Sequence, residues 1–408
     1  MKSEYITRAI EPVIKKAAAE FPAVVLTGPR QSGKTTVLKR MFSESCRYVS
    51  LELPDVRQAA LEDPRGFLAQ YSPPVIFDEI HYAADLLPYI KERIDEKRDE
   101  PGQYIMTGSQ NLMIMEKVTE TLAGRTAVLK LLPLSRREIE GTGQTCFPWE
   151  QGFEADSRTE PICFGRLWDM FLRGFYPEIN VHTERDTGLW FSSYIQTYLE
   201  RDVRTLRQVG DLIQFQTFVR ALAARSAQLL NMTELARDLG IAVNTVKQWI
   251  SILEATHQVI ILRPYFANTG KRLVKTPKVY FTDTGLLCHL TGNKDAEQAA
   301  KGPMGGYVME TAVIIEIVKT IVHRGEEPRV YFWRTAAGNE VDFIIESGQK
   351  AVPVEVKLSA TVKPAMSSSI RVFKKDLSGR ASEGYVVHPG NTSLPLGEGV
   401  FSIPFGNL

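Results

Sequence analysis

The feature that most constrains this chain is the octapeptide Gly-Pro-Arg-Gln-Ser-Gly-Lys-Thr at residues 28–35, which directly follows the apolar run 22–27. It matches the pattern G-x-x-x-x-G-K-[ST], in which two glycines let the backbone turn so that successive N–H groups point at phosphate oxygens. A loop with this pattern binds phosphate when it connects a buried strand to a helix, because the positive end of the helix dipole then also faces the phosphates. It therefore predicts an α/β fold with a parallel sheet in the N-terminal part of the chain.

The motif assigns a role to its polar side chains. Lys34 is expected to reach the β- and γ-phosphates of a nucleotide and to act in catalysis, and the Thr35 hydroxyl is expected to ligate Mg²⁺. The predicted cofactors are therefore ATP and Mg²⁺. The predicted nucleotide-binding residues are Gly28, Pro29, Arg30, Gln31, Ser32, Gly33, Lys34, Thr35 and Thr36.

A second motif, Val-Ile-Phe-Asp-Glu at residues 75–79, ends an apolar strand candidate with two carboxylates. Asp78 is expected to hold Mg²⁺, directly or through water, and Glu79 to act as the general base that polarises the attacking water. Two acids at a strand end more often form a solvated cap. The phosphate-binding motif upstream in the same alternating unit favours the catalytic interpretation, so we predict ATP hydrolysis as well as binding.

Two further polar residues follow later strand candidates. Ser109, after the run 103–107, is predicted to lie beside the γ-phosphate, although a simple strand-ending turn explains it equally well. Arg125 precedes the next strand candidate, 126–131, and an arginine there can stabilise the charge of a transferred phosphoryl group, often from a neighbouring subunit. As a lone residue, Arg125 would more often be an ordinary surface arginine.

Composition narrows the class of protein without naming a partner. The chain has 408 residues, 44% hydrophobic and 24% charged, and it contains no run near the roughly 18 to 20 apolar residues of a membrane span. Residues 1–10 lack the apolar core of a signal peptide, so a cytoplasmic location is expected. A net charge of +1 excludes a globally basic coat but not a local basic face. The spacing of the four cysteines does not match a zinc site, so we expect them to be reduced and to act as small apolar residues.

A helix-turn-helix pattern occupies residues 232–256. The run 233–240 predicts a capped helix that ends in a turn glycine, and 244–250 predicts a second helix with polar side chains suited to base edges and phosphates. The following β-rich stretch carries Lys271, Arg272, Lys275 and Lys278 and is predicted to lie on a DNA backbone as a wing. A packing or protein-docking module is the alternative. The predicted DNA-binding residues are Asn244, Thr245, Lys247, Gln248, Lys271 and Arg272.

The C-terminal part carries an acidic constellation. Asp342 lies in the strand candidate 340–346, and Glu355 shares a face with Lys357 in the next strand, with the neighbouring valines turned into the core. If the strands pair as a hairpin, Asp342 and Glu355 can hold Mg²⁺ while Lys357 orients or activates a water for phosphodiester attack. Glu310, on the preceding helix candidate, is predicted as an additional metal ligand. A hairpin with solvated outward charges is the alternative.

These motifs together resemble those of AAA-type ATPases, and more closely a bacterial and archaeal branch whose C-terminal half is a domain of unknown function. The resemblance covers nearly the whole chain, including residues 28–35, 77–80, 107–109, 124–125, 132–135, 194–203 and 355–357. It implies an ATPase that assembles into a homo-oligomer with Arg125 acting in trans. AAA proteins usually have Asn where this chain has Ser109. The C-terminal pattern is similar to the PD-(D/E)xK pattern of restriction-endonuclease-like folds, with Val341 in place of Pro.

The predicted organisation has four parts, because a chain of this length exceeds one ordinary core. They are an α/β AAA-type ATPase domain at 1–140, a linker and helical segment at 141–210, a winged helix-turn-helix at 211–295, and an α/β nuclease-like domain at 296–408. The first functional hypothesis is an ATPase that couples its nucleotide state to duplex DNA binding and metal-dependent cleavage. The second is a switch-type ATPase whose C-terminal half only binds a protein or nucleic acid.

Overall fold

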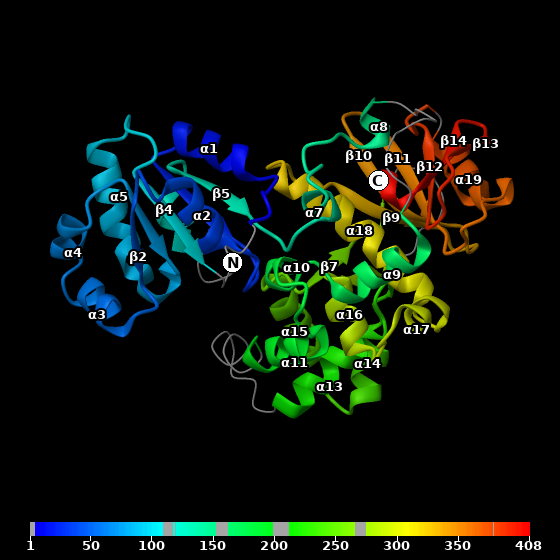
Figure 1. Ribbon diagram of the computed structural model, residues 1–408, viewed down its shortest axis with the longest axis horizontal. Coiled ribbons are helices and arrows are strands. Elements are labelled where there is room, and N and C mark those ends of the chain that lie inside the picture. The colour runs from blue at the N-terminus through cyan, green and yellow to red at the C-terminus, as the bar shows by residue number, and fades with distance from the viewer. Residues whose placement is uncertain are drawn as a thin grey trace.

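The computed structural model describes residues 5–108, 117–118, 120–151, 162–198, 212–265, 275–377 and 379–408. Figure 1 shows an α/β domain at the N-terminal end, a mainly helical middle region and a mixed-sheet domain at the C-terminal end. Ser109, Lys271, Arg272 and the segment 199–203 lie outside the described residues. None of the helices within these ranges has both the length and the apolar character that crossing a membrane requires.

The N-terminal domain is built on a five-stranded parallel sheet in the order β2-β3-β4-β1-β5, which confirms the predicted parallel sheet. Both faces are buried, because Val25 and Phe77 pack in one apolar cluster while Leu26 and Ile76 pack in another. The strands are β1 (Ala23–Thr27), β2 (Arg47–Ser50), β3 (Val75–Asp78), β4 (Tyr104–Gly108) and β5 (Thr126–Lys130). The helices are α1 (Glu11–Glu20), α2 (Lys34–Phe42), α3 (Pro54–Glu62), α4 (Pro64–Gln70), η1 (Ile80–Leu86) and α5 (Leu87–Glu96).

The middle region follows two short helices, α7 (Arg136–Ile139) and α8 (Pro148–Gln151). The expected helix-turn-helix is present, although its first helix begins one residue earlier than predicted because the side chain of Asn231 accepts the N–H of Glu234 at 3.1 Å. Gly240 ends that helix in the left-handed region, at φ 64°. The elements are α9 (Phe164–Arg173), α10 (Pro177–Val181), α11 (Thr187–Tyr198), α13 (Leu212–Ala223), β6 (Gln228–Leu229), α14 (Met232–Leu239), α15 (Val243–Ala255), β7 (Val259–Leu262), β8 (Lys278–Phe281), α16 (Thr284–Leu290) and α17 (Ala296–Lys301).

The C-terminal domain has a six-stranded mixed sheet in the order β13-β14-β12-β11-β10-β9. Its strand β11 lies inside the sheet between β10 and β12 and is buried on both faces, so Glu355 is not on a solvated hairpin face. The elements are α18 (Gly305–His323), β9 (Val330–Arg334), β10 (Glu340–Ser347), β11 (Lys350–Val356), η3 (Pro364–Ser367), α19 (Ser368–Leu377), β12 (Gly384–His388), β13 (Leu394–Gly397), β14 (Val400–Pro404) and η4 (Phe405–Asn407).

Helix α18 joins the middle region to the C-terminal sheet. It is buried almost all round, which is typical of a helix enclosed by other elements rather than lying on a surface. One apolar cluster contains residues of α9, α15, α18 and the sheet strands β10 to β12, so these parts share a continuous core. The N-terminal sheet has its own clusters. The molecule therefore consists of an N-terminal body and a second body organised around α18 (Figure 1).

Candidate functional site

Both glycines of residues 28–35 have positive φ angles that other residues rarely adopt. Gly28 has φ 148°, and a Cβ there would lie 2.0 Å from the carbonyl oxygen of Leu131. Gly33 has φ 92° and directly precedes α2, so the loop turns from the end of β1 into a helix N-terminus. This is the backbone course that a phosphate-binding loop requires.

The polar groups of this loop point inward. Lys34 is buried, and its Nζ donates to the carbonyl oxygens of Gly28 at 3.0 Å and Pro29 at 2.8 Å. The hydroxyl of Ser32 is also fully buried and has no hydrogen-bond partner among the described residues. A buried hydroxyl without a partner is costly, so the loop has the donors that a phosphate group would satisfy.

Asp78 lies at the carboxyl end of β3, beside the loop, as the sequence predicts. Its carboxylate accepts hydrogen bonds from the hydroxyls of Thr35 at 2.9 Å, Tyr48 at 2.6 Å and Thr107 at 2.5 Å. A carboxylate and a threonine hydroxyl in direct contact are the oxygen ligands that Mg²⁺ takes in nucleotide sites. Tyr48 and Thr107 were not predicted as partners of Asp78, because only the sheet order places their strands next to β3.

Glu79 adopts a left-handed backbone conformation at φ 56°, which is unfavourable for a glutamate. Two neighbours hold it there. Its N–H donates to the hydroxyl of Thr107 at 3.0 Å, and its Oε2 lies 3.0 Å from Nδ1 of His81. The His81 side chain is 4% exposed, so this contact is shielded from water. Sequence analysis missed His81, although its position two residues after the acidic pair was visible.

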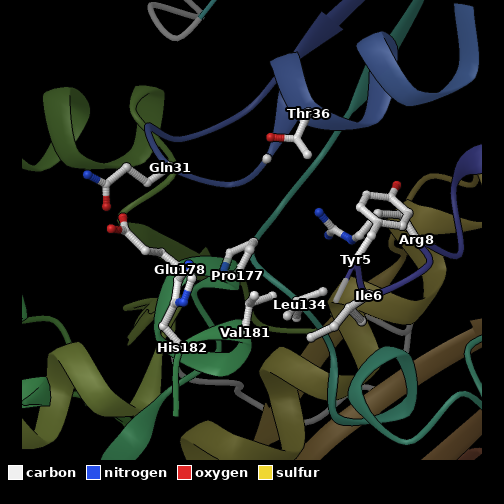
Figure 2. A pocket seen from close by; sticks show the side chains of 11 residues that line it. Tyr5, Ile6, Arg8, Gln31, Thr36, Leu134, Pro177, Glu178, Val181 and His182 are labelled. Atoms are coloured by element: carbon white, nitrogen blue, oxygen red, sulfur yellow. The ribbon is translucent and has the colours of Figure 1, made fainter. Parts of the chain in front are cut away.

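A cavity of about 420 Å³ opens beside the loop at the junction of two parts of the chain. Figure 2 shows its walls: Tyr5, Ile6 and Arg8 near the N-terminal end, Gln31 and Thr36 from the loop and α2, and Pro177, Val181 and His182 at α10. The cavity contains the predicted loop residues on one side only. Its opposite wall comes from α10 of the middle region, and no sequence motif predicts that placement.

Arg125 lies at the far end of the sheet from the loop. Thr126 pairs with Ala23 at the start of β1, whereas the loop follows the end of that strand. The guanidinium contacts Asp95, with Nε to Oδ1 at 2.6 Å. Arg125 therefore cannot reach the phosphate loop of its own chain, and its predicted role in a neighbouring subunit stays a prediction.

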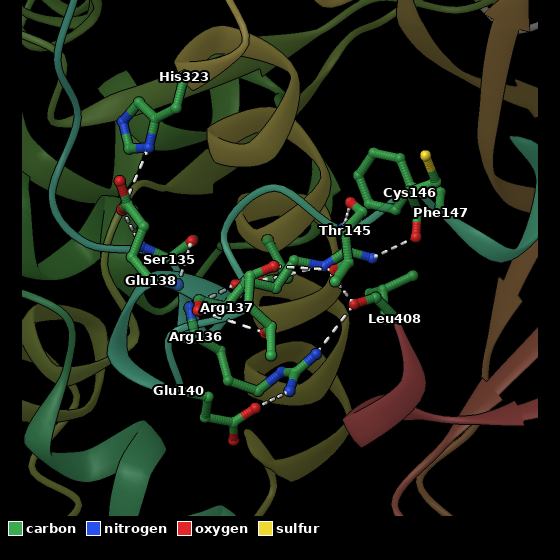
Figure 3. A network of polar contacts seen from close by, with 12 residues as sticks. Ser135, Arg136, Arg137, Glu138, Glu140, Thr145, Cys146, Phe147, His323 and Leu408 are labelled. Atoms are coloured by element: carbon green, nitrogen blue, oxygen red, sulfur yellow. Dashed lines mark hydrogen bonds and ion pairs between the residues drawn. The ribbon is translucent and has the colours of Figure 1, made fainter. Parts of the chain in front are cut away.

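A buried polar network connects the loop to α18. Arg8 donates to the carbonyl oxygen of Ser32 at 2.7 Å and to Glu138 at 3.1 Å. Oε2 of Glu138 lies 3.2 Å from Nδ1 of His323, whose Nε2 accepts the N–H of Leu132 at 3.1 Å (Figure 3). A neutral His323 therefore carries its proton on Nδ1, toward Glu138. The network joins the phosphate loop, α7 and the C-terminal end of α18.

The same network includes the two arginines of α7. Arg136 and Arg137 both donate to the backbone oxygen of Leu408, at 2.9 Å and 2.7 Å (Figure 3). Their backbone N–H groups donate to the Glu316 carboxylate of α18 at 2.8 Å and 3.2 Å. Helix α7 is thus fastened to the C-terminal domain by several buried hydrogen bonds.

His257 is another residue that sequence analysis missed. It follows α15, has a left-handed backbone at φ 57°, and its Nε2 has no hydrogen-bond partner among the described residues. Burial, aided by the positive charges of Lys130 and Lys34, lowers the pKa of His257 to about 3. The buried imidazole of His257 is therefore neutral at pH 7.

The predicted DNA-binding face is only partly described. On α15, Asn244, Lys247 and Gln248 are exposed and Thr245 is half-buried. Lys275 is also exposed. The expectation that Lys278 lies on a surface wing is wrong, because Lys278 is 3% exposed and points into the acidic constellation of the C-terminal domain.

The acidic constellation does assemble. Asp342 accepts the N–H of Val356 at 2.8 Å, and Glu355 pairs with Lys357 at 2.5 Å. Burial, together with the charge of Asp342, raises the pKa of Glu310 to about 7. Burial also raises the pKa of Asp342 and Glu355. Nevertheless, within the ranges that the structure describes, no group of three or more His, Cys, Asp or Glu side chains is arranged to hold a metal ion.

Three family models match the chain. An AAA domain matches residues 20–140, a domain of unknown function (DUF8612) matches residues 165–297, and a second domain of unknown function (DUF4143) matches residues 305–408. The AAA match covers the five-stranded sheet and the phosphate-binding loop. The two other descriptions state no activity.

Relatives over the full length are uncharacterized. Proteins of Mycobacterium tuberculosis and Mycobacterium bovis are each 31% identical over 396 residues, which cover 96% of this chain and 82% of theirs. A protein of Haemophilus influenzae is 22% identical over 358 residues, 81% of each chain. A Walker-type ATPase of Pyrococcus abyssi superposes with a TM-score of 0.45 at 14% identity, over 71% of this chain and 97% of that one, a likeness too weak to support an argument.

Proposed function

The chain belongs to the family of these uncharacterized mycobacterial proteins and has an AAA domain at its N-terminal end, and from this premise we propose that it is a Mg²⁺-dependent ATPase whose nucleotide state controls its C-terminal half. The observation that carries the proposal is the contact of Thr35 with Asp78 beside the inward-facing loop. Thr35 and Asp78 hold the metal ion. Mg²⁺ neutralises charge on the phosphates when it is bound.

Lys34 and Glu79 perform the remaining chemistry. The ammonium of Lys34 binds the β- and γ-phosphates, with the loop N–H groups and Ser32 beside it. Glu79 accepts a proton from the attacking water, and His81 holds the carboxylate in place through the 3.0 Å contact with Oε2. The cavity beside Gln31 and Thr36 is large enough for the rest of a nucleotide and takes its base between the N-terminal segment and α10.

Two contacts support the coupling of the site to the rest of the molecule. Arg8 links the loop carbonyl of Ser32 to Glu138, and Glu138 to His323 on α18. Helix α10, which forms one wall of the cavity beside the loop, brings the middle region close to the nucleotide. Because α18 is buried on nearly every side, a shift at its His323 end displaces the C-terminal domain as a unit.

The exposed polar face of α15 supports duplex DNA as the partner of the middle region. Arg125 acts from a neighbouring subunit in this proposal, since it lies at the opposite sheet edge from its own loop. The C-terminal domain serves as a binding module rather than a nuclease, because a lysine of β8 lies among its carboxylates. Metal-dependent cleavage, which the sequence pattern predicts, is not part of this proposal.

Nucleotide binding and turnover of two variants test the ATPase. Lys34→Ala removes a charge-assisted contact worth about 1.5–3 kcal/mol, so its Kd for ATP should rise roughly tenfold to hundredfold. Glu79→Gln should bind ATP like the wild type and lose turnover by about a hundredfold or more. Glu62→Gln, an exposed substitution on α3, is the matched control. Wild-type turnover in Glu79→Gln would refute the assigned base, and unchanged ATP affinity in Lys34→Ala would refute the site.

A further inference from the structure

A lysine from the middle region lies inside the carboxylate cluster of the C-terminal domain. Nζ of Lys278 is 2.9 Å from Oε1 of Glu310, 2.5 Å from Oε1 of Glu340 and 3.9 Å from Oδ1 of Asp342. The three carboxylates come from α18 and β10, which lie far from Lys278 in the sequence. Oxygens that converge on one positive group from several elements are what a bound divalent cation also requires.

Lys278 is held rigidly in this position. It begins β8, the central strand of the sheet β6-β8-β7, and pairs with Leu229 on one side and Leu262 on the other. Its side chain is 3% exposed. Tyr280, on the same strand, donates its hydroxyl to Oε1 of Glu310 at 2.6 Å and so fixes the carboxylate that Lys278 binds. The ammonium is therefore a built part of the fold and not a mobile surface charge.

The cluster combines buried carboxyl groups with basic side chains from separate elements. Four carboxylates (Glu310, Glu340, Asp342 and Glu355) face three cations (Lys278, Lys357 and Arg334). Burial lowers the pKa of Lys278, but the three carboxylates around it outweigh burial and raise it above its usual value. Oε2 of Glu355 is buried and has no hydrogen-bond partner among the described residues. The cluster thus depends on Lys278 for its balance.

We propose that the ammonium of Lys278 is the resident cation of this cluster and occupies the position that a divalent metal ion would otherwise take. The wild-type chain consequently binds no divalent cation at Glu310 and Asp342, the two predicted metal ligands that Lys278 contacts. The lysine also ties β8 to α18 and β10, so the middle region and the C-terminal domain are joined through the cluster. A substitution of Lys278 that removes the ammonium but changes the shape of the side chain little should turn the cluster into a site for a hard divalent cation such as Mn²⁺.

The test counts Mn²⁺ ions bound per chain, by electron paramagnetic resonance of the free ion, in the full-length protein without nucleotide. Lys278→Met keeps the length of the side chain and removes its charge. We expect Lys278→Met to bind one more Mn²⁺ than the wild type, and Lys278→Met/Asp342→Asn to lose that ion again. Mn²⁺ ions bound near the phosphate loop add the same number to every variant, because every variant retains that site.

Lys319→Met is the matched control, since Lys319 is a buried lysine of α18 that donates to the carbonyl oxygen of Leu134 outside the cluster. It should gain no Mn²⁺ ion.

Thermal unfolding gives an independent measurement. Saturating Mn²⁺ should raise the Tm of Lys278→Met. The wild type and Asp342→Asn should show equal shifts in Tm when Mn²⁺ is added.

Two results would overturn the proposal. One is a folded Lys278→Met that binds no more Mn²⁺ than the wild type. The other is a wild-type chain that loses a bound Mn²⁺ when Asp342 becomes Asn, because the ion would then bind beside Lys278. The second comparison does not require Lys278→Met to fold. Neither result depends on ATP hydrolysis, so both leave the ATPase proposal intact.

Discussion

At the scale of single residues, buried charges in this molecule are positioned by partners from distant segments. The carboxylate of Asp78 accepts hydrogen bonds from hydroxyl groups of three different elements. The carboxylate of Glu138 contacts Arg8 and His323 and accepts the backbone N–H groups of Ala9 and Ser135. Burying a carboxylate is costly unless its oxygens are bonded in this way. Such residues are therefore sensitive to the loss of any one partner.

Glu138 yields a prediction about acid stability. Burial raises its pKa, but Arg8 and His323 outweigh burial and hold the pKa well below the ordinary value of 4.5. A carboxyl with a lowered folded pKa contributes stability above its unfolded pKa and loses that contribution as the pH falls. Glu138→Gln should therefore cost about 3–5 kcal/mol at pH 7, because it leaves Arg8 buried without its charged partner.

The measurement is urea unfolding of the wild type and Glu138→Gln at pH 7 and in acid. The difference in unfolding free energy should shrink once the pH falls below the unfolded value of about 4.5. Glu150→Gln, which loses a partly exposed pair with Arg324, is the control and should cost less than about 1 kcal/mol. Equal costs for the two variants at pH 7 would contradict the assigned role of Glu138.

At the scale of elements, helices α15 and α18 differ in how much of their surface is buried. Helix α15 buries Val246, Ile250 and Leu253 and leaves a polar face exposed, as its sequence periodicity predicts. Helix α18 is buried on nearly every side and carries Glu310 near one end and His323 at the other. It thus connects the acidic cluster with the network around the phosphate loop.

The exposed face of α15 gives a test of DNA binding. Lys247→Glu should weaken binding to duplex DNA and lower the slope of log affinity against log salt by about one, because one phosphate contact is lost. It should also reduce any rise in ATP turnover that duplex DNA causes. Lys301→Glu, an exposed lysine at the end of α17, is the control. The DNA proposal fails if the two variants bind duplex DNA equally well.

At the scale of the whole molecule, Arg125 is predicted to act in a neighbouring copy of the chain. It lies at the amino ends of the sheet strands, opposite the loop, and so faces outward from its own nucleotide site. Arg125→Ala and Glu79→Gln should each lose turnover, the first by on the order of a thousandfold when ATP is saturating. Mixing the two inactive proteins should restore activity, because an intact site then receives an arginine from its neighbour.

Mixing experiments follow ATP turnover at a constant total protein concentration. Mixed assemblies of Arg125→Ala with Lys34→Ala should also recover activity, whereas Glu79→Gln mixed with Lys34→Ala should not, since neither retains a working nucleotide site. Arg125 would be a purely structural residue if Arg125→Ala alone turned over ATP like the wild type. Its pair with Asp95 would then explain its presence.

Local pattern was sufficient for part of this fold and site. Residues 28–35, the acidic end of β3 and the helix-turn-helix were recognisable because each depends on neighbours within a few positions: a strand, a turn and a helix start. The parallel N-terminal sheet followed from continuous apolar strands that alternate with helices. By itself, the sequence thus determined the phosphate-binding loop, the acidic strand end beside it, the helix-turn-helix and the parallel N-terminal sheet, whereas α19 and β12 to β14 were not predicted.

Tertiary structure alone decided which distant side chains meet. Lys278 looked like a surface wing residue in the sequence, but the β6-β8-β7 sheet directs it at Glu310, Glu340 and Asp342. Arg8 reaches the phosphate loop from a segment that carries no motif. The physical reason is that buried charges are stabilised by contacts between separate elements, and periodicity along one element contains no information about the element packed against it.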